Sequence, residues 1–215
     1  MCARQPEARP VAQQRITHKR RTAVQTHDSV ATTYEVGYVV GSLSKQSINR
    51  RLATALSTLA PAELRLTEIP IGDLPLYDHE LDADFPQVGW DLKRAVEASD
   101  AILFVTPEHN RSIPAALKNA IDWATRPWGS NSLDGKPVAV IGASPGKVST
   151  AVAQQHLKNI LSFTNSPVLG QPEAYINYSD GLVTEDGKVT SEGTEQFLRQ
   201  FMEAFSSHIR KSRDE

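Results

Sequence analysis

Residues 101–105 read Ala-Ile-Leu-Phe-Val, an uninterrupted apolar run that ends at Thr106-Pro107. A strand covered on both faces needs apolar side chains in both directions, whereas a strand with one wet face alternates. The run therefore predicts a central strand of a parallel sheet, with helices packed on both faces of that sheet.

Strand and helix patterns alternate on both sides of this run. The expected strands are residues 34–40, 63–69, 101–105, 138–141 and 174–176. The expected helices are residues 48–59, 88–98, 114–124, 147–163 and 197–209. Leu64 and Leu66 alternate with charged residues, which favours an edge position for the second strand. Five such units predict a three-layer, doubly wound α/β fold with right-handed crossovers.

Composition excludes several classes of protein. The net charge is -2, which gives no electrostatic case for nucleic acid or an anionic membrane as a partner. The single cysteine, Cys2, excludes disulfide frameworks and cysteine-rich metal sites, and we expect no bound metal. No apolar stretch approaches the roughly 20 residues that cross a bilayer. We therefore expect a cytoplasmic protein.

The first 33 residues differ from the rest of the chain. Six basic residues stand there against two acidic ones, which gives these 33 residues a charge of about +4. Because the whole chain has a net charge of -2, residues 34–215 carry about -6. We interpret residues 1–33 as a disordered basic extension that precedes one domain, residues 34–215. A nucleic-acid arm or a targeting peptide is the alternative.

Ligands of open α/β sheets bind beyond the carboxyl ends of the strands, where the strand order reverses. In the flavodoxin-like order 2-1-3-4-5 this point lies between the first and third strands. Residues 41–49 (GSLSKQSIN) follow the first strand and offer hydroxyls and a helix N-terminus. These groups suit a phosphate monoester, although Ser47 as a simple helix N-cap explains them equally well.

Two further segments follow strands near the same point. Residues 106–114 (TPEHNRSIP) place polar side chains between two prolines, which indicates a rigid turn able to bond the edge of a planar ring. The alternative is that Glu108 and Asn110 serve only backbone groups of turns and caps. Residues 142–146 (GASPG) are small enough to let the backbone approach a ligand closely, but they do not match a Walker A loop.

These segments, together with residues 69–78 (IPIGDLPLYD), closely resemble the NADPH-dependent FMN reductases, which include quinone- and chromate-reducing flavoproteins. The resemblance runs from about Tyr38 to the last helix. It implies a flavodoxin-like fold, non-covalent FMN, and NADPH or NADH as hydride donor. It also implies a homodimer or homotetramer and a small acceptor: a free flavin, a quinone, an azo compound or chromate.

The resemblance also implies which residues hold the cofactor. The phosphate and ribityl chain would lie among Ser42, Leu43, Ser44, Lys45, Ser47, Ile48 and Asn49. The ring would be lined by Pro107, Glu108, His109 and Asn110, and its pyrimidine end approached by Ala143, Ser144 and Gly146. Residues 73–77 would lie near a subunit interface. Because the flavin supplies the chemistry, we name no catalytic residue.

The chain departs from the family pattern at three places. Ser44 replaces a usual arginine of the phosphate loop, His109 replaces a usual tyrosine, and residues 148–150 replace glycines. Two competing interpretations remain, and the changes at Ser44 and His109 bear on the second of them. One is an electron carrier without its own NAD(P)H turnover, and the other is a scaffold protein that has lost flavin.

Overall fold

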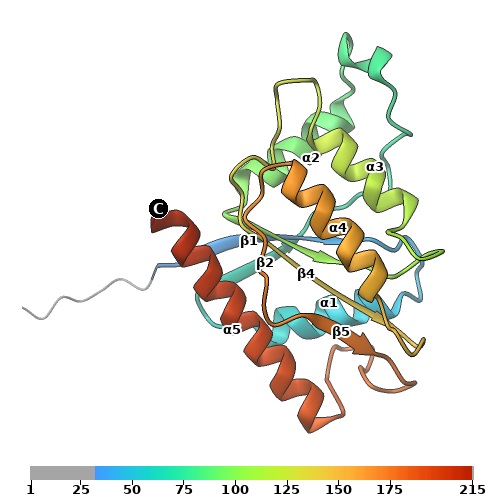
Figure 1. Ribbon diagram of the computed structural model, residues 1–215, viewed down its shortest axis with the longest axis vertical. Helices are drawn as coiled ribbons and strands as arrows, with labels where there is room; N and C mark the ends of the chain where they lie inside the picture. Colours follow the sequence, from blue (N-terminus) through green and yellow to red (C-terminus); the bar gives the residue numbers. More distant parts are fainter. Residues whose placement is uncertain (1–31, 215) are drawn as a thin grey trace, which may run out of the picture. The chain divides into compact units, whose positions relative to one another are not determined.

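Five parallel strands form one sheet in the order β2-β1-β3-β4-β5, as a computed structural model that describes residues 32–214 shows (Figure 1). The strands are β1 (Tyr34–Val40), β2 (Leu64–Glu68), β3 (Ala101–Val105), β4 (Val138–Ser144) and β5 (Ala174–Asn177). The predicted order 2-1-3-4-5 is therefore confirmed. The predicted extension, residues 1–33, lies almost wholly outside the described residues, as does Cys2.

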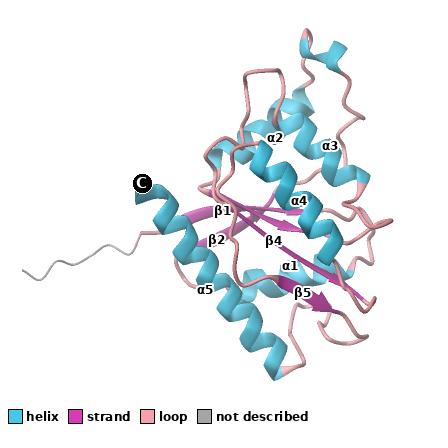
Figure 2. Cartoon of the chain, viewed as in Figure 1, coloured by secondary structure: helices cyan, strands magenta, loops and turns pink. Residues whose placement is uncertain are grey.

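Helices cover both faces of the sheet, so the predicted three layers are confirmed (Figure 2). One face packs against α1 (Ile48–Leu59) and α5 (Glu192–Asp214). The other face packs against α2 (Gln87–Ala98), α3 (Ala115–Ala124) and α4 (Ala151–Phe163). A short 3₁₀ turn, η1 (His79–Asp82), lies in the loop between β2 and α2. Among the described helices none is long and apolar enough to cross a membrane.

The central strand β3 carries the core on both of its faces. All five of its residues are buried. Leu103 and Val105 belong to the core beneath α1 and α5, whereas Ile102 and Phe104 belong to the core beneath α2, α3 and α4. The continuous apolar run is therefore explained by a sheet that is covered on both sides.

The last helix uses its aromatic side chains for packing. Phe201, Phe205 and Ile209 are fully buried against the sheet, and Phe197 packs partly buried beside them. These residues recur every four positions, which places them on one face of a helix. The aromatic stripe is therefore core.

Several element boundaries differ from the sequence prediction, and three of them have a clear structural reason. Strand β4 continues to Ser144, because its pairing with β5 extends to Asn177. Helix α4 begins at Ala151 because Ser149 has a left-handed backbone (φ 49°) that a helix cannot accommodate. Pro114 stands at the N-cap of α3, just outside the first turn.

Lys93 is a buried charge that ties α2 to the loop after α3. Its ammonium donates to the carbonyls of Ala124 and Ser130 and to the Ser132 hydroxyl, which in turn donates to Glu97. Burial lowers the pKa of Lys93, although nearby Glu97 acts in the opposite direction. This network satisfies the buried cation and fixes the course of residues 124–132.

Candidate functional site

The carboxyl ends of β1, β3 and β4 meet at one open hollow of about 250 Å³, which we call the switch-point hollow. The strand order reverses between β1 and β3, so the hollow lies where ligands of such sheets bind. Its lining comes from the three loops that the sequence singled out: Ser42, Gln46, Ser47, Ile48, Asn49, Pro107, Glu108, His109, Ala143, Ser144 and Pro145.

The N-terminus of α1 opens into this hollow. Ser47 is its N-cap, and the Ser47 hydroxyl accepts a hydrogen bond from the Arg50 amide at 3.3 Å. The predicted capping role of Ser47 is therefore confirmed. Within residues 32–214 the amides of Ile48 and Asn49 have no acceptor, as is usual for a first helical turn. Open amides at the positive end of a helix dipole attract an anion.

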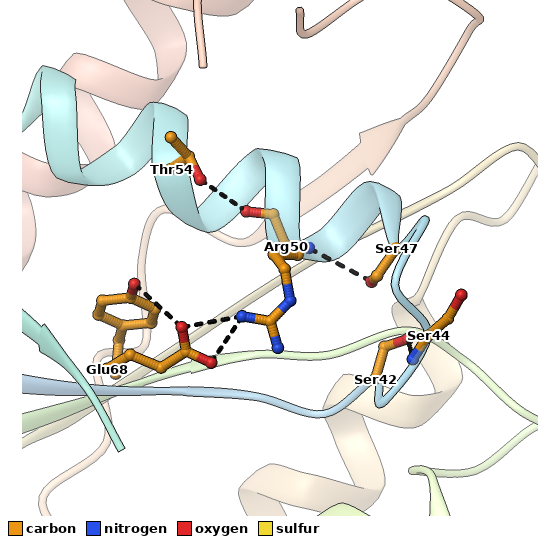
Figure 3. A network of polar contacts seen from close by, with 7 residues as sticks. Ser42, Ser44, Ser47, Arg50, Thr54 and Glu68 are labelled. Carbon is orange, nitrogen blue, oxygen red and sulfur yellow. Dashed lines mark hydrogen bonds and ion pairs between the residues drawn. The ribbon is translucent and has the colours of Figure 1, made fainter. Parts of the chain in front are cut away.

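The first turn of α1 is also held to the sheet edge. The Arg50 guanidinium pairs with the carboxylate of Glu68 in β2, with nitrogen–oxygen distances of 2.6 and 2.8 Å (Figure 3). The Tyr38 hydroxyl lies 3.5 Å from the same carboxylate. Burial, then the charge of Glu68, raises the pKa of Tyr38, so this phenol stays protonated. The pairing fixes α1 and largely neutralises the charge of Arg50.

Asn49 joins the first loop to the fourth strand. Its side chain is 1% exposed, donates to the Ala143 carbonyl and accepts from the Ala143 amide, each at 2.9 Å. Both partners of the Asn49 amide are therefore backbone groups of β4. The role of Asn49 visible in the structure is to hold two walls of the switch-point hollow at a fixed separation.

Glu108 is held by groups of the protein itself. One carboxylate oxygen accepts from the amides of Val152 and Ala153, at 3.1 and 3.0 Å, and the other accepts from Arg111 at 2.8 Å. Burial acts to raise the pKa of Glu108, but the Ala153 amide and Arg111 outweigh it and hold the pKa below its ordinary range. Glu108 is therefore a buried carboxylate in the loop between β3 and α3 that caps the N-terminus of α4.

Gly142, at the start of the third loop (residues 142–146), lies so close to the second loop (residues 106–114) that no side chain fits between them. A Cβ on Gly142 would stand 2.1 Å from the Thr106 carbonyl oxygen and 2.6 Å from the Thr150 hydroxyl. Only glycine fits where β4 passes the end of β3. Beyond it, the Ser144 hydroxyl accepts from the Gly146 amide at 3.2 Å, which closes a tight turn on the rim.

Nine of the fourteen predicted site residues line the switch-point hollow. They are Ser42, Ser47, Ile48, Asn49, Pro107, Glu108, His109, Ala143 and Ser144. The other five are exposed and stand outside its lining: Leu43, Ser44, Lys45, Asn110 and Gly146. Contact of any of the fourteen with a cofactor stays a prediction.

Sequence reasoning missed three residues of the site. Gln46 and Pro145 line the hollow; both belong to the segments that the sequence analysis selected, but neither was predicted as a site residue. Arg111 was overlooked because its partner, Glu108, faces it only when the chain turns back between them. Consecutive left-handed residues at Asn110 and Arg111 make that turn, and no glycine marks it in the sequence.

A larger groove of about 810 Å³ lies elsewhere, between α3 and α4. We call it the α3–α4 groove; Ile121, Trp128, Ile160 and Phe163 form its apolar part. Trp128 and Phe163 are 79% and 83% exposed. It lies away from the carboxyl ends of the strands, so its size does not make it the ligand site.

The switch-point hollow offers hydroxyls and open amides at one end and apolar surface from Ile48, Pro107 and Ala143 near them. That set suits a phosphate joined to a planar ring. Within the described part of the chain no group of His, Cys, Asp and Glu is placed to hold a metal ion.

Comparison with known proteins agrees with this geometry. A family model described as NADPH-dependent FMN reductase matches residues 34–181. The chain is 42% identical over 179 residues to a 2-hydroxy-1,4-benzoquinone reductase of Burkholderia sp, covering 83% of this chain and 98% of that protein. It is 43% identical to a quinone reductase of Pseudomonas putida, covering 86% of this chain and 99% of the other.

A solved structure is similar over the same region. It is FerB, a flavoenzyme NAD(P)H:(acceptor) oxidoreductase from Paracoccus denitrificans, with 47% sequence identity and a TM-score of 0.81. The match covers 84% of this chain and 99% of that one.

Proposed function

Because the chain belongs to the NADPH-dependent FMN reductase family, we propose that it is an FMN-containing enzyme that reduces a small acceptor with NADPH or NADH. A quinone is the acceptor class we favour, because relatives at 42–43% identity over nearly their whole length are named for quinones. Free flavin, azo compounds and chromate are the other acceptors implied by the family resemblance.

The observation that supports this function most is the meeting of three loops at one hollow beside an open helix N-terminus. We propose that the amides of Ile48 and Asn49 and the hydroxyls of Ser42 and Ser47 receive the FMN phosphate. Lys45, exposed on the same loop, adds positive charge in place of the arginine that Ser44 replaces.

The ring would lie against the second and third loops. Pro107 and Ala143 offer apolar contact, and backbone groups of residues 107–110 and 143–146 offer hydrogen bonds to its edge. When bound, FMN would supply the redox chemistry, which is hydride transfer from the nicotinamide to the acceptor in a ping-pong cycle. The protein positions the ring and leaves one face open, so no side-chain acid or base is required.

We further propose that the enzyme is a homodimer or homotetramer built on the α3–α4 groove. Trp128, which lines the groove, and Leu76, in the segment that the family resemblance places near an interface, are large apolar side chains left exposed. The guanidinium of Arg126 lies over the rings of Tyr77 and Trp128, at 5.8 and 5.2 Å from their centres. Arg126 therefore connects the segment that contains Leu76 and Tyr77 to the groove residue Trp128. A second copy of the chain would bury this surface. The expected cytoplasmic location stays a prediction.

Two measurements test the proposed activity. The visible spectrum of the purified protein should show a flavin that denaturation releases as FMN. Rapid mixing with NADPH under anaerobic conditions should then bleach that spectrum, and a quinone should restore it. Bound flavin that neither NADPH nor NADH bleaches would indicate an electron carrier. Colourless protein that FMN does not reconstitute would indicate a scaffold.

A further inference from the structure

We propose that Glu108 is a positioning residue, whose carboxylate fixes the turn at residues 107–112 against α4 and acts on a bound flavin through that turn rather than by contact. The inference rests on the proposed function for its effect on flavin. Its structural part rests only on contacts within the chain.

The carboxylate of Glu108 has little capacity left for a ligand. Its side chain is 7% exposed, and its oxygens accept from two amides of α4 and from the guanidinium of Arg111. Three donors, one of them charged, satisfy most of the acceptor sites of a carboxylate. A flavin in the hollow would therefore meet the backbone of this turn and the side chains beside Glu108.

The turn needs such a brace because its backbone is strained. Asn110 and Arg111 both have left-handed conformations, with φ of 50° and 63°, and neither is glycine. His109 and Ser112 exchange two backbone hydrogen bonds of 2.9 Å, which closes the turn into a tight hairpin. Strained backbone persists only where the surroundings over-determine it, and it concentrates at ligand sites.

A second contact ties the same turn to α4. The Ser112 hydroxyl lies 3.1 Å from Nδ1 of His156, one turn beyond the amides that Glu108 accepts from. The turn is therefore attached to the helix at two points. His109, which lines the hollow, stands between these attachments, so its position depends on both.

The same carboxylate decides which helix end stays open to an anion. The N-terminus of α1 lines the switch-point hollow, the N-terminus of α4 contacts Glu108 on the lining, and each helix end attracts negative charge. Glu108 supplies that charge at α4 from within the chain, whereas the first amides of α1 remain without an acceptor in the described residues. Glu108 thus directs a phosphate to α1 and orients the ligand across the hollow.

The test compares Glu108→Ala, Glu108→Gln and Arg111→Ala with Glu195→Ala, a control that removes an ion pair within α5. Amide resonances of the apoprotein report the brace, and FMN titration of the same samples reports its effect. In Glu108→Ala we expect the Val152 and Ala153 amide protons to move upfield, and the Kd for FMN to rise about tenfold, as when a hydrogen bond to a charged group is lost.

The other variants separate positioning from contact. Glu108→Gln keeps one acceptor oxygen, so it should recover part of the FMN affinity. Arg111→Ala should weaken FMN as well, and the double variant should lose less than the sum of the two single losses. Glu195→Ala should change neither readout. If one variant does not fold, the others still give both readouts.

Two results would overturn the inference. One is unmoved Val152 and Ala153 amides together with weakened FMN binding, which would mean direct contact between Glu108 and the flavin. The other is shifted amides with unchanged FMN affinity, which would mean a purely structural cap. Failure of the wild-type protein to bind FMN would instead refute the proposed function, and the amide shifts would still report the brace.

Discussion

The side chain of Asn49 donates to the carbonyl of Ala143 and accepts from the amide of Ala143, although 94 residues separate the two in the chain. The pair holds the first turn of α1 beside the end of β4, where the three loops of the switch-point hollow meet. The hollow is therefore tied to the packed core of the domain and is not formed by loops alone.

Replacing Asn49 by alanine should destabilise the protein and weaken FMN binding together. The change leaves the buried amide and carbonyl of Ala143 without partners, which costs about 2–4 kcal/mol in the free energy of unfolding. Urea unfolding and FMN titration measure the two effects. Asn49→Asp should be no better, because a carboxylate cannot donate to the Ala143 carbonyl. Full stability in Asn49→Ala would contradict this role of the pair.

Gly142, in β4, and Gly146, in the loop after it, should respond very differently to alanine. Gly142→Ala forces a Cβ against the Thr106 carbonyl and should cost about 1–3 kcal/mol or more in the free energy of unfolding. In Gly146→Ala the nearest atom, the Ser144 hydroxyl oxygen, lies 3.5 Å from the new Cβ, so the change should stay within about 0.5 kcal/mol. Equal effects in urea unfolding would show that β3 and β4 do not approach this closely.

The stabilising effect of Glu108 should depend on pH. Its pKa is lowered in the folded protein, from an ordinary value of 4.5. Its ionised form therefore adds stability above pH 4.5, and this gain is lost as the pH falls through the folded value. We expect the wild type to exceed Glu108→Gln by about 1–3 kcal/mol at pH 7. Urea unfolding of both proteins should show the gap closing below pH 4.5; a gap independent of pH would be inconsistent with a buried charged cap.

A charge in the α3–α4 groove should break the proposed oligomer. Trp128→Glu combined with Phe163→Glu places two carboxylates on the apolar surface that a second copy would cover. Analytical ultracentrifugation should find the wild type as a dimer or tetramer and the double variant as a monomer. Val148→Glu changes an exposed apolar residue outside the groove and should not alter the mass. A wild type that sediments as a monomer would refute the interface.

The fold followed from local patterns, because those patterns reflect burial. The apolar run at residues 101–105 placed β3 in the middle of the sheet, and alternation at Leu64 and Leu66 placed β2 at its edge. Ser47 could be identified as an N-cap because that role depends on its neighbours alone. The first residue of α4 could not be predicted, because it depends on the left-handed backbone of Ser149. Serine has no intrinsic preference for that conformation.

The site followed only in outline. Chain order and strand order together bring the three loops to one edge, so the location of the hollow could be predicted. The bonds of Asn49 to Ala143 and of Glu108 to the amides of α4 could not be predicted, since these partners lie more than 40 residues away in sequence. Contact of both residues with the cofactor stays a prediction; in the structure their polar atoms bond to the protein backbone and, for Glu108, also to Arg111.

Ser47→Asp tests most directly whether the N-terminus of α1 receives a phosphate. Aspartate is as good an N-cap as serine, so the free energy of unfolding should change by less than about 0.5 kcal/mol. Its added negative charge should repel the FMN phosphate and raise the Kd for FMN about tenfold or more, whereas riboflavin, which has no phosphate, should bind with unchanged affinity. Fluorescence titration of the apoprotein measures both ligands. An FMN affinity that Ser47→Asp leaves unchanged would contradict the account.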